Sequence, residues 1–181
     1  KLSNAQKSCV DEILEDLRNS SIMYRLVQGD VGSGKTLVAI IALVACVFSN
    51  NQGAFMAPTD LLARQHYKTI TSLLKDTNIK VELLVSDISA ASKKEIKNKL
   101  RNGEIDIVVG THALIQKDVE FKNLGLAVID EQHRFGVKQR QVLRSKGEKV
   151  DLLLMSATPI PRTLAHTIYG DLDISTIDEF P

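Results

Sequence analysis

The sequence has few aromatic residues and almost no net charge. None of its 181 residues is tryptophan, and aromatic residues make up 4% of the chain. Platforms that stack the bases of single-stranded nucleic acid are built from aromatic side chains, so this composition argues against one. Lysine and arginine number 23 against 22 aspartate and glutamate, which gives a formal net charge of +1. No overall field therefore draws the chain to nucleic acid or to a membrane, although a local basic patch stays compatible with DNA binding.

A cysteine framework and a membrane-length hydrophobic run are also missing. The two cysteines, Cys9 and Cys46, fall in apolar segments with helical spacing, so we expect buried thiols rather than a disulfide. The longest apolar run, residues 37–48, is too short to span a bilayer, and no signal peptide opens the chain. These observations predict a cytoplasmic protein without a membrane partner.

Short apolar strands alternate with helical patterns along the chain, and the length suits one domain over residues 1–181. Strands are expected at residues 24–28, 53–57, 81–85, 106–110, 126–130, 152–156 and 173–177, and helices at 4–19, 36–48, 60–76, 92–100 and 161–169. This order predicts an α/β fold, a mainly parallel sheet with helices on both faces. Ligands of such sheets bind at the carboxyl ends of the strands. We expect Ser92 and Glu95 to form a capping box for the helix that Gly103 ends.

A glycine-rich motif follows the first expected strand and precedes a helix. Residues 29–36, GDVGSGKT, match the phosphate-loop pattern G-x-x-x-x-G-K-[ST] at each fixed position. A chance glycine turn is the alternative, and the strand and helix around the motif argue against it. Glycines with positive φ would let successive N–H groups surround a phosphate. The predicted nucleotide-binding residues are Gly29, Asp30, Val31, Gly32, Ser33, Gly34, Lys35 and Thr36.

Two carboxylates end the apolar strand at residues 126–130. Buried acids are costly unless they are paired, hydrogen-bonded or bound to metal. Beside a phosphate loop, Asp130 is expected to hold Mg²⁺ together with Thr36, and Glu131 to polarise the water that attacks the γ-phosphate. Lys35 would bind the β- and γ-phosphates. We therefore predict that Lys35, Asp130 and Glu131 are catalytic and that the cofactors are ATP and Mg²⁺; a solvated acidic turn is the alternative.

Three classes of enzyme share this loop. A GTPase should carry an N-K-x-D guanine-binding motif, which this sequence does not contain. A small-molecule kinase needs an acceptor pocket and an arginine-rich lid, and neither is identifiable. A water-activating glutamate next to a metal-binding aspartate favours an ATPase.

Further stretches carry a family resemblance over nearly the whole chain. They are QGDVGSGKT (28–36), PTDLLARQH (58–66), GTHALIQ (110–116), VIDEQHRFGVKQR (128–140), MSATPIPR (155–162) and YGDLD (169–173). In these stretches the chain resembles the first, RecA-like motor lobe of superfamily 2 helicases, and in particular the RecG family. Members of that family are ATP-dependent DNA helicases that remodel branched DNA, such as replication forks and recombination junctions, in DNA repair and recombination.

Two alternatives to that family stay open. The transcription-repair coupling factors share the RFGV and TPIPR stretches, but Gln28, Ser33 and Gln132 match RecG better. A non-motor P-loop ATPase that ignores DNA is the second alternative.

The resemblance implies roles for residues outside the phosphate loop. Gln6 would bind the adenine edge through its amide; the alternative is a solvent-facing helix residue. Thr59 and Thr111 would each cap a helix whose N–H groups meet DNA phosphates. The implied DNA-contacting and coupling residues are Thr59, Arg64, Gln65, Thr111, His112, Gln132, His133, Ser156 and Thr158. Asp60 would oppose a phosphate, and His66 and His166 are expected on helix surfaces.

The resemblance also implies parts that this sequence does not contain. Such motors bind ATP between two RecA-like lobes, and the second lobe supplies an arginine finger. A domain that binds the DNA junction precedes the motor in RecG. Because the chain starts at Lys1 rather than Met and stops at Pro181, we expect a piece of a longer, monomeric motor. Alone, this lobe would hydrolyse ATP slowly. The basic run of Arg134, Lys138, Arg140 and Arg144 is interpreted as a solvated helix face, with a contact to DNA as the alternative.

Overall fold

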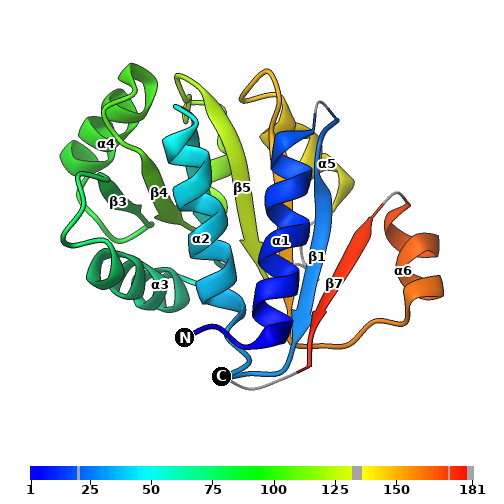
Figure 1. Cartoon of the computed structure of the whole chain (residues 1–181). Helices are drawn as coiled ribbons and strands as arrows, with labels where there is room; N and C mark the ends of the chain where they lie inside the picture. Colours follow the sequence, from blue (N-terminus) through cyan, green and yellow to red (C-terminus); the bar gives the residue numbers. More distant parts are fainter. Residues whose placement is uncertain (20, 132–135, 171, 179–181) are drawn as a thin grey trace.

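The computed structural model describes residues 1–19, 21–131, 136–170 and 172–178. In that part of the chain the expected strands and helices are present, with differences at their ends, and helices at residues 112–115 and 137–144 are additional to them (Figure 1). The strands are β1 (Tyr24–Gly29), β2 (Gln52–Met56), β3 (Val81–Leu84), β4 (Ile107–Gly110), β5 (Leu124–Asp130), β6 (Asp151–Ser156) and β7 (Asp173–Ile177). The helices are α1 (Asn4–Arg18), α2 (Lys35–Phe48), α3 (Asp60–Leu73), α4 (Ala90–Asn102), α5 (Val137–Arg144) and α6 (Arg162–Tyr169), with a 3-10 helix, η1 (His112–Ile115).

The strands form one sheet in the order β3-β4-β2-β5-β6-β1-β7, and every neighbouring pair is parallel. Their carboxyl ends therefore lie at one edge of the sheet. In Figure 1 this is the lower edge, toward which β4 and β5 point and where the loop from β1 enters α2. The predicted α/β fold with a parallel sheet is confirmed.

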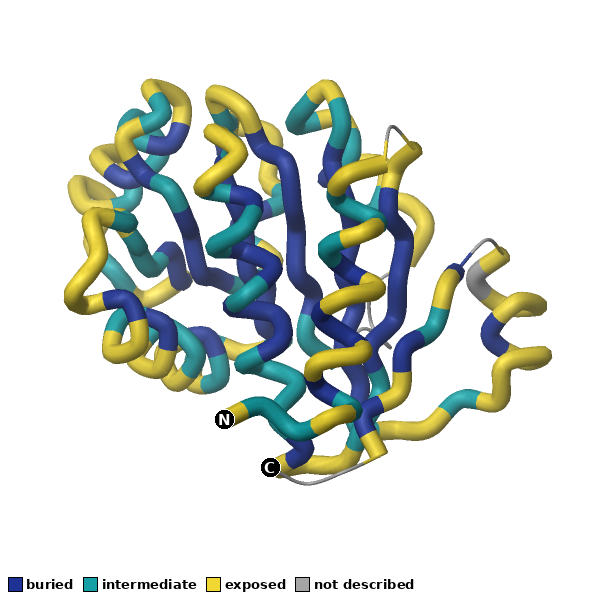
Figure 2. Tube along the Cα trace, in the orientation of Figure 1, coloured by how far each residue is buried: buried dark blue, intermediate teal, exposed yellow. Residues whose placement is uncertain are grey.

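Helices cover both faces of the sheet, because successive strand residues point to opposite faces. Along β1, Val27 packs in the cluster under α1, α2 and α3, whereas Leu26 packs in the cluster that includes residues of α4, α5 and α6. Along β5, Val128 and Ala127 divide in the same way. The strands are accordingly buried over most of their length (Figure 2). This explains why the central strands carry apolar residues at successive positions rather than only at alternate ones.

Both cysteines are buried and free, as predicted. Burial raises the pKa of the Cys9 thiol to about 11 and that of Cys46 to about 12. At neutral pH both are therefore protonated, and neither has the thiolate that disulfide exchange or metal binding requires.

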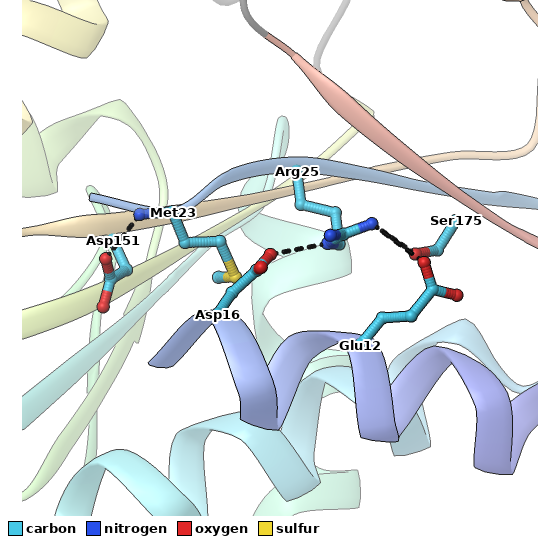
Figure 3. Close-up of polar contacts among 6 residues, drawn as sticks. All are labelled: Glu12, Asp16, Met23, Arg25, Asp151 and Ser175. Carbon is cyan, nitrogen blue, oxygen red and sulfur yellow. Dashed lines mark hydrogen bonds and ion pairs between the residues drawn. The ribbon is translucent and has the colours of Figure 1, made fainter. Parts of the chain in front are cut away.

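A buried arginine joins α1 to the β1 edge of the sheet, and no sequence pattern revealed it. Arg25 on β1 donates from Nε to Asp16 at 2.8 Å and from Nη1 to Glu12 at 3.2 Å, both on α1 (Figure 3). The same Nη1 donates to Ser175 Oγ on β7 at 2.9 Å. These bonds satisfy a charge that would otherwise be costly at 8% exposure. They hold α1, and with it the residues at its start, against the sheet.

One helix begins elsewhere than predicted. The N-cap of α4 is Ser89, whose hydroxyl accepts from the Ser92 backbone N–H. The expected capping box of Ser92 and Glu95 is therefore wrong, because a second serine three residues upstream takes that role. The predicted stop is confirmed: Gly103 has φ 79° and closes the helix in the left-handed conformation.

The basic run does not form a merely solvated face. Within α5, the guanidinium carbons of Arg140 and Arg144 lie 4.7 and 5.5 Å from the ring centre of Tyr24. Burial, reinforced by the nearby Arg140 charge, lowers the pKa of Arg144. The aliphatic stems and planar heads of these arginines therefore pack α5 against β1, which corrects the sequence interpretation.

Candidate active site

The loop between β1 and α2 needs its glycines for two different reasons. Gly32 and Gly34 have φ angles of 86° and 89°, a region that side chains disfavour. Gly29 has no positive φ, so the prediction for that position is wrong. A Cβ there would lie 2.7 Å from Ser33 Oγ and 2.8 Å from the Ile177 carbonyl oxygen. Gly29 is required because β7 and the loop pack against it.

The N-terminus of α2 is open. Gly34 is its N-cap and offers no side chain to accept from the first N–H groups, and its first turn carries no acid. The orphan N–H groups and the helix dipole favour an anion at this position. Lys35 Nζ donates to the carbonyl oxygens of Gly29 and Asp30 at 2.6 and 3.1 Å, which places its charge at the loop. The arrangement suits a phosphate chain.

Gln6 lies against this loop and is 1% exposed, so the alternative of a solvent-facing residue is wrong. Its Oε1 accepts from the Ser3 N–H at 2.8 Å in a capping box at the start of α1. Its Nε2 donates to the carbonyl oxygens of Ser33 and Gly34 at 3.4 and 3.5 Å. Gln6 thus positions the loop backbone from behind; its contact with adenine stays a prediction.

The register of the sheet brings Asp130 level with the start of the loop. Asp130 pairs with Met155 on β6, and Met155 pairs with Val27 on β1. Two strand spacings separate Asp130 from Val27, or about 10 Å. The loop begins two residues beyond Val27, at the same carboxyl edge. A cation bound to a nucleotide's terminal phosphates fits between them.

The chain turns sharply just after Asp130. Glu131 has φ 52°, rare for a residue with a side chain, and its N–H donates to the Met155 carbonyl oxygen at 3.0 Å. Both carboxylates line one small pocket with Pro58 and His112. Strand residues normally alternate between faces, and the turn at Glu131 lets two neighbours border the same space.

His66 was expected on a helix surface, and the structure corrects this. It lies on α3, and its Nε2 is 2.8 Å from Asp130 Oδ2. The imidazole packs on the Phe55 ring, with centres 4.5 Å apart and planes inclined by 39°. No local pattern indicates this contact, because the partners are 64 positions apart.

The predicted DNA-contacting residues lie at the starts of α3 and η1. Thr59 caps α3, its hydroxyl accepting from the Leu62 N–H at 3.2 Å. On α3, Gln65 is exposed and Arg64 forms an ion pair with Asp87. Thr111 makes no side-chain cap bond, and the element after it is a 3-10 helix of four residues, so its predicted capping role is wrong. His112 in η1 is exposed.

The end of β6 forms a local turn. Ser156 Oγ accepts from the Thr158 N–H at 3.1 Å, so these two predicted coupling residues contact each other. Gln28, at the end of β1, accepts from the Ile160 N–H at 2.9 Å and donates to Thr176 Oγ1 at 3.3 Å. Sequence reasoning missed this cross-link between the phosphate-loop strand, the TPIPR segment and β7. Gln132 and His133 lie outside the described residues.

Among the described residues, no group of three or more His, Cys, Asp or Glu side chains is placed to hold a metal by itself. This donor set fits Mg²⁺ bound with a nucleotide, because Mg²⁺ keeps several waters and takes phosphate oxygens plus one or two protein ligands. Thr36 and Asp130 would be those ligands. In the same part of the chain no helix is long and apolar enough to cross a bilayer.

Comparison with known proteins shows which family the chain belongs to. The model of the DEAD/DEAH box helicase family matches residues 3–167. The chain belongs to the DEAD/DEAH box helicase family. Membership of this family of helicases implies the use of ATP.

Within the helicases, the chain is similar to RecG proteins. It is 56% identical to the ATP-dependent DNA helicase RecG of Thermotoga maritima, over all of this chain and 23% of that protein. It is 54% identical to RecG of Bacillus subtilis, over 99% of this chain and 26% of the relative. The chain thus spans about a quarter of the length of these curated relatives.

Solved helicase structures share the fold. A structure of RecG bound to a three-way DNA junction superimposes on this whole chain with a TM-score of 0.88 and 52% identity, over 24% of that chain. A DEAD box protein from Methanococcus jannaschii gives a TM-score of 0.72 at 27% identity, over 98% of this chain and 50% of that one.

Proposed function

We propose that residues 1–181 form the ATP-binding, first RecA-like motor lobe of a RecG-type DNA helicase. The observation that carries the proposal is the open N-terminus of α2, set at the same sheet edge as the carboxylate-tipped strand β5. The similarity to RecG over the whole chain favours this function over a coupling factor or a non-motor ATPase.

The chain's own residues divide the work of phosphoryl transfer. The N–H groups of the loop and of the first turn of α2 bind the phosphates, and Lys35 adds a charge that neutralises the β- and γ-oxygens. Thr36 and Asp130 would hold Mg²⁺, which would supply positive charge to neutralise the phosphates when bound. Glu131 orients a water and takes its proton, and Gln6 contacts the adenine.

Other residues would connect this chemistry to DNA. Exposed Arg64, Gln65 and His112, together with Thr59 and Thr111, contact the backbone of one strand of a branched DNA. Such contacts do not depend on sequence and weaken with salt. Gln132, His133, Ser156 and Thr158 relay the state of the γ-phosphate to these contacts and to the second lobe.

The chain's length relative to RecG supports a larger machine. A second RecA-like lobe in the same polypeptide supplies the arginine finger, and a separate domain binds the junction. The complete protein works in the cytoplasm as a monomer. This lobe alone binds ATP and turns it over slowly, because the finger is worth about 10³–10⁵ in rate.

ATPase activity of the full-length protein, measured with and without a branched DNA, tests the proposal. We expect the DNA to stimulate turnover and Lys35→Ala to abolish it. Activity that ignores DNA would identify a non-motor ATPase. Nucleotide binding without turnover would identify a module that has lost catalysis. Either result overturns the motor function.

A further inference from the structure

One contact joins the candidate magnesium ligand to the candidate DNA-binding helix. His66 Nε2 lies 2.8 Å from Asp130 Oδ2, and the two side chains are 15% and 12% exposed. A hydrogen bond shielded to this degree is stronger than one in water and costly to lose. An ionised carboxylate only accepts, so Nε2 carries the proton of this bond.

The imidazole is held in place on its other side. Its ring packs on Phe55, a fully buried residue of β2, the strand next to β5. His66 therefore has a fixed ring plane and a fixed direction for its N–H. It occupies only Oδ2 of Asp130 in this bond, and the carboxylate has a second oxygen with which to bind a cation.

The backbone of His66 belongs to α3, two residues beyond Arg64 and one beyond Gln65. Both of those side chains are exposed, as candidate DNA contacts must be. A rigid helix thus has one side chain on the nucleotide's metal ligand and others on the surface proposed to meet DNA. A displacement of α3 by DNA would move the hydrogen-bond donor of Asp130.

We propose that His66 is a positioning residue that orients Asp130 for magnesium and couples nucleotide binding to DNA binding through α3. The inference rests on the proposed function and deepens it. Partners that orient a metal-binding side chain are typically worth 10–100-fold in metal affinity. The coupling arises because the same hydrogen bond is part of the nucleotide site and of the helix that contacts DNA.

Two substitutions separate the hydrogen bond from the packing. His66→Phe keeps an aromatic ring on Phe55 and removes the donor. His66→Gln keeps an amide donor near the position of Nε2 and gives up the ring. An exposed histidine on α6, His166, supplies the matched control as His166→Phe.

The first readout is Mg²⁺-dependent binding of a fluorescent, non-hydrolysable ATP analogue to the full-length protein. We expect His66→Phe to raise the Mg²⁺ concentration for half-maximal binding about tenfold. His66→Gln should restore much of the loss, and His166→Phe should match the unchanged protein. The positioning role is wrong if His66→Phe has an unaltered Mg²⁺ requirement, or if His66→Gln is as impaired as His66→Phe.

The second readout is the ratio of analogue affinities with and without a branched DNA. If His66 couples the sites, His66→Phe brings this ratio toward one while the affinity for DNA alone stays unchanged. A ratio equal to that of the unchanged protein refutes the coupling. If the unchanged protein itself shows no Mg²⁺-dependent analogue binding or no effect of DNA, the proposed function is wrong. If only the His66 variants give the unexpected result, the role of His66 is wrong and the proposed function stands.

Discussion

Helices α2 and α3 both begin at the carboxyl edge of the sheet, directly after a strand, yet their N-termini differ. At α2 the cap is Gly34, which has no side chain to accept from the first N–H groups, and the first turn has no acid. At α3 the Thr59 hydroxyl accepts from the Leu62 N–H, and Asp60 stands in the first turn. The N-terminus of α2 is open to an anion, whereas that of α3 has a capping hydrogen bond and carries a negative charge.

The difference separates two kinds of phosphate contact. An open terminus can bind a phosphate through its N–H groups and dipole, as α2 is proposed to do for ATP. A capped terminus with an acid binds a phosphate less well, because the cap occupies an N–H group and the acid repels the phosphate. We therefore expect α3 to contact DNA through exposed side chains farther along, such as Arg64 and Gln65. Two helices that begin at the same edge of the sheet are thus expected to contact phosphates in different ways.

The largest effect is expected opposite the open terminus, at the residue proposed to activate water. Glu131→Gln keeps the size of the side chain and removes the base, so kcat for ATP should fall about 10²–10⁴-fold while ATP still binds. DNA-stimulated ATPase and analogue binding, measured on the same full-length preparation, check both halves. Unchanged turnover would show that another group is the base.

A negative charge at the N-terminus of α2 should weaken its binding of phosphate, as Asp60 is expected to do at α3. Gly34→Asp and Gly34→Asn share the same backbone strain at φ 89°, but only the aspartate adds a charge. The charge at the helix start should weaken ATP binding of Gly34→Asp by about 5–30-fold relative to Gly34→Asn, equivalent to ~1–2 kcal/mol. Calorimetric titration with an ATP analogue measures the difference. Equal affinities would mean that the N-terminus of α2 does not meet the phosphates.

At α3 the cap should matter for stability more than for DNA. Thr59→Ala removes the bond to the Leu62 N–H and should lower the free energy of unfolding by ~1 kcal/mol. Asp60→Asn should tighten DNA binding a few-fold, because it removes a charge that repels phosphate. Urea unfolding and DNA titration measure the two effects. A loss of DNA affinity in Thr59→Ala that exceeds its loss of stability would show that the contact of this hydroxyl with DNA outweighs its role as the cap.

The smallest effect concerns the opposite edge of the sheet. Asp151, at the start of β6, accepts from the Met23 N–H at 2.7 Å and is 5% exposed. Burial raises its pKa, although the Met23 bond opposes this. The charged form of Asp151 is therefore disfavoured in the folded protein, which lowers the free energy of unfolding at neutral pH. This loss of stability shrinks as the pH falls through the raised pKa, and it is gone below the pKa of an unfolded aspartate. Asp151→Asn, which retains an acceptor, should stabilise the protein at neutral pH and progressively less in acid. A stability difference that grows in acid would contradict the assignment.

Much of the fold could be predicted from the sequence, because its signals are local. Each of these signals affects only the few residues around it. Examples are the apolar runs of strand length, the glycine loop and the Asn102-Gly103 helix stop. Helix α4 shows where local signals compete: two serines three positions apart offered a cap, and Ser89 forms it. Boundaries of this kind depend on packing that a pattern does not record.

The candidate site could be located from its motifs, but its contacts could not. Gln6 on α1 contacts Ser33 and Gly34 in the loop before α2, and His66 on α3 contacts Asp130 at the end of β5. Such pairs are distant in the sequence and become neighbours only through the order of the strands. Gly29 shows a related limit, since its requirement comes from β7, which follows it by more than a hundred residues.

The backbone angle of Glu131 has a consequence for engineering. A φ of 52° is one that glycine adopts without penalty, and other residues hold at a cost of order 1 kcal/mol or more. Glu131→Gly would relieve this backbone cost and at the same time remove the proposed base. The conformation of this turn and the chemistry at its side chain therefore place opposite demands on position 131, and a variant chosen for an unstrained backbone would still bind ATP but hydrolyse it far more slowly.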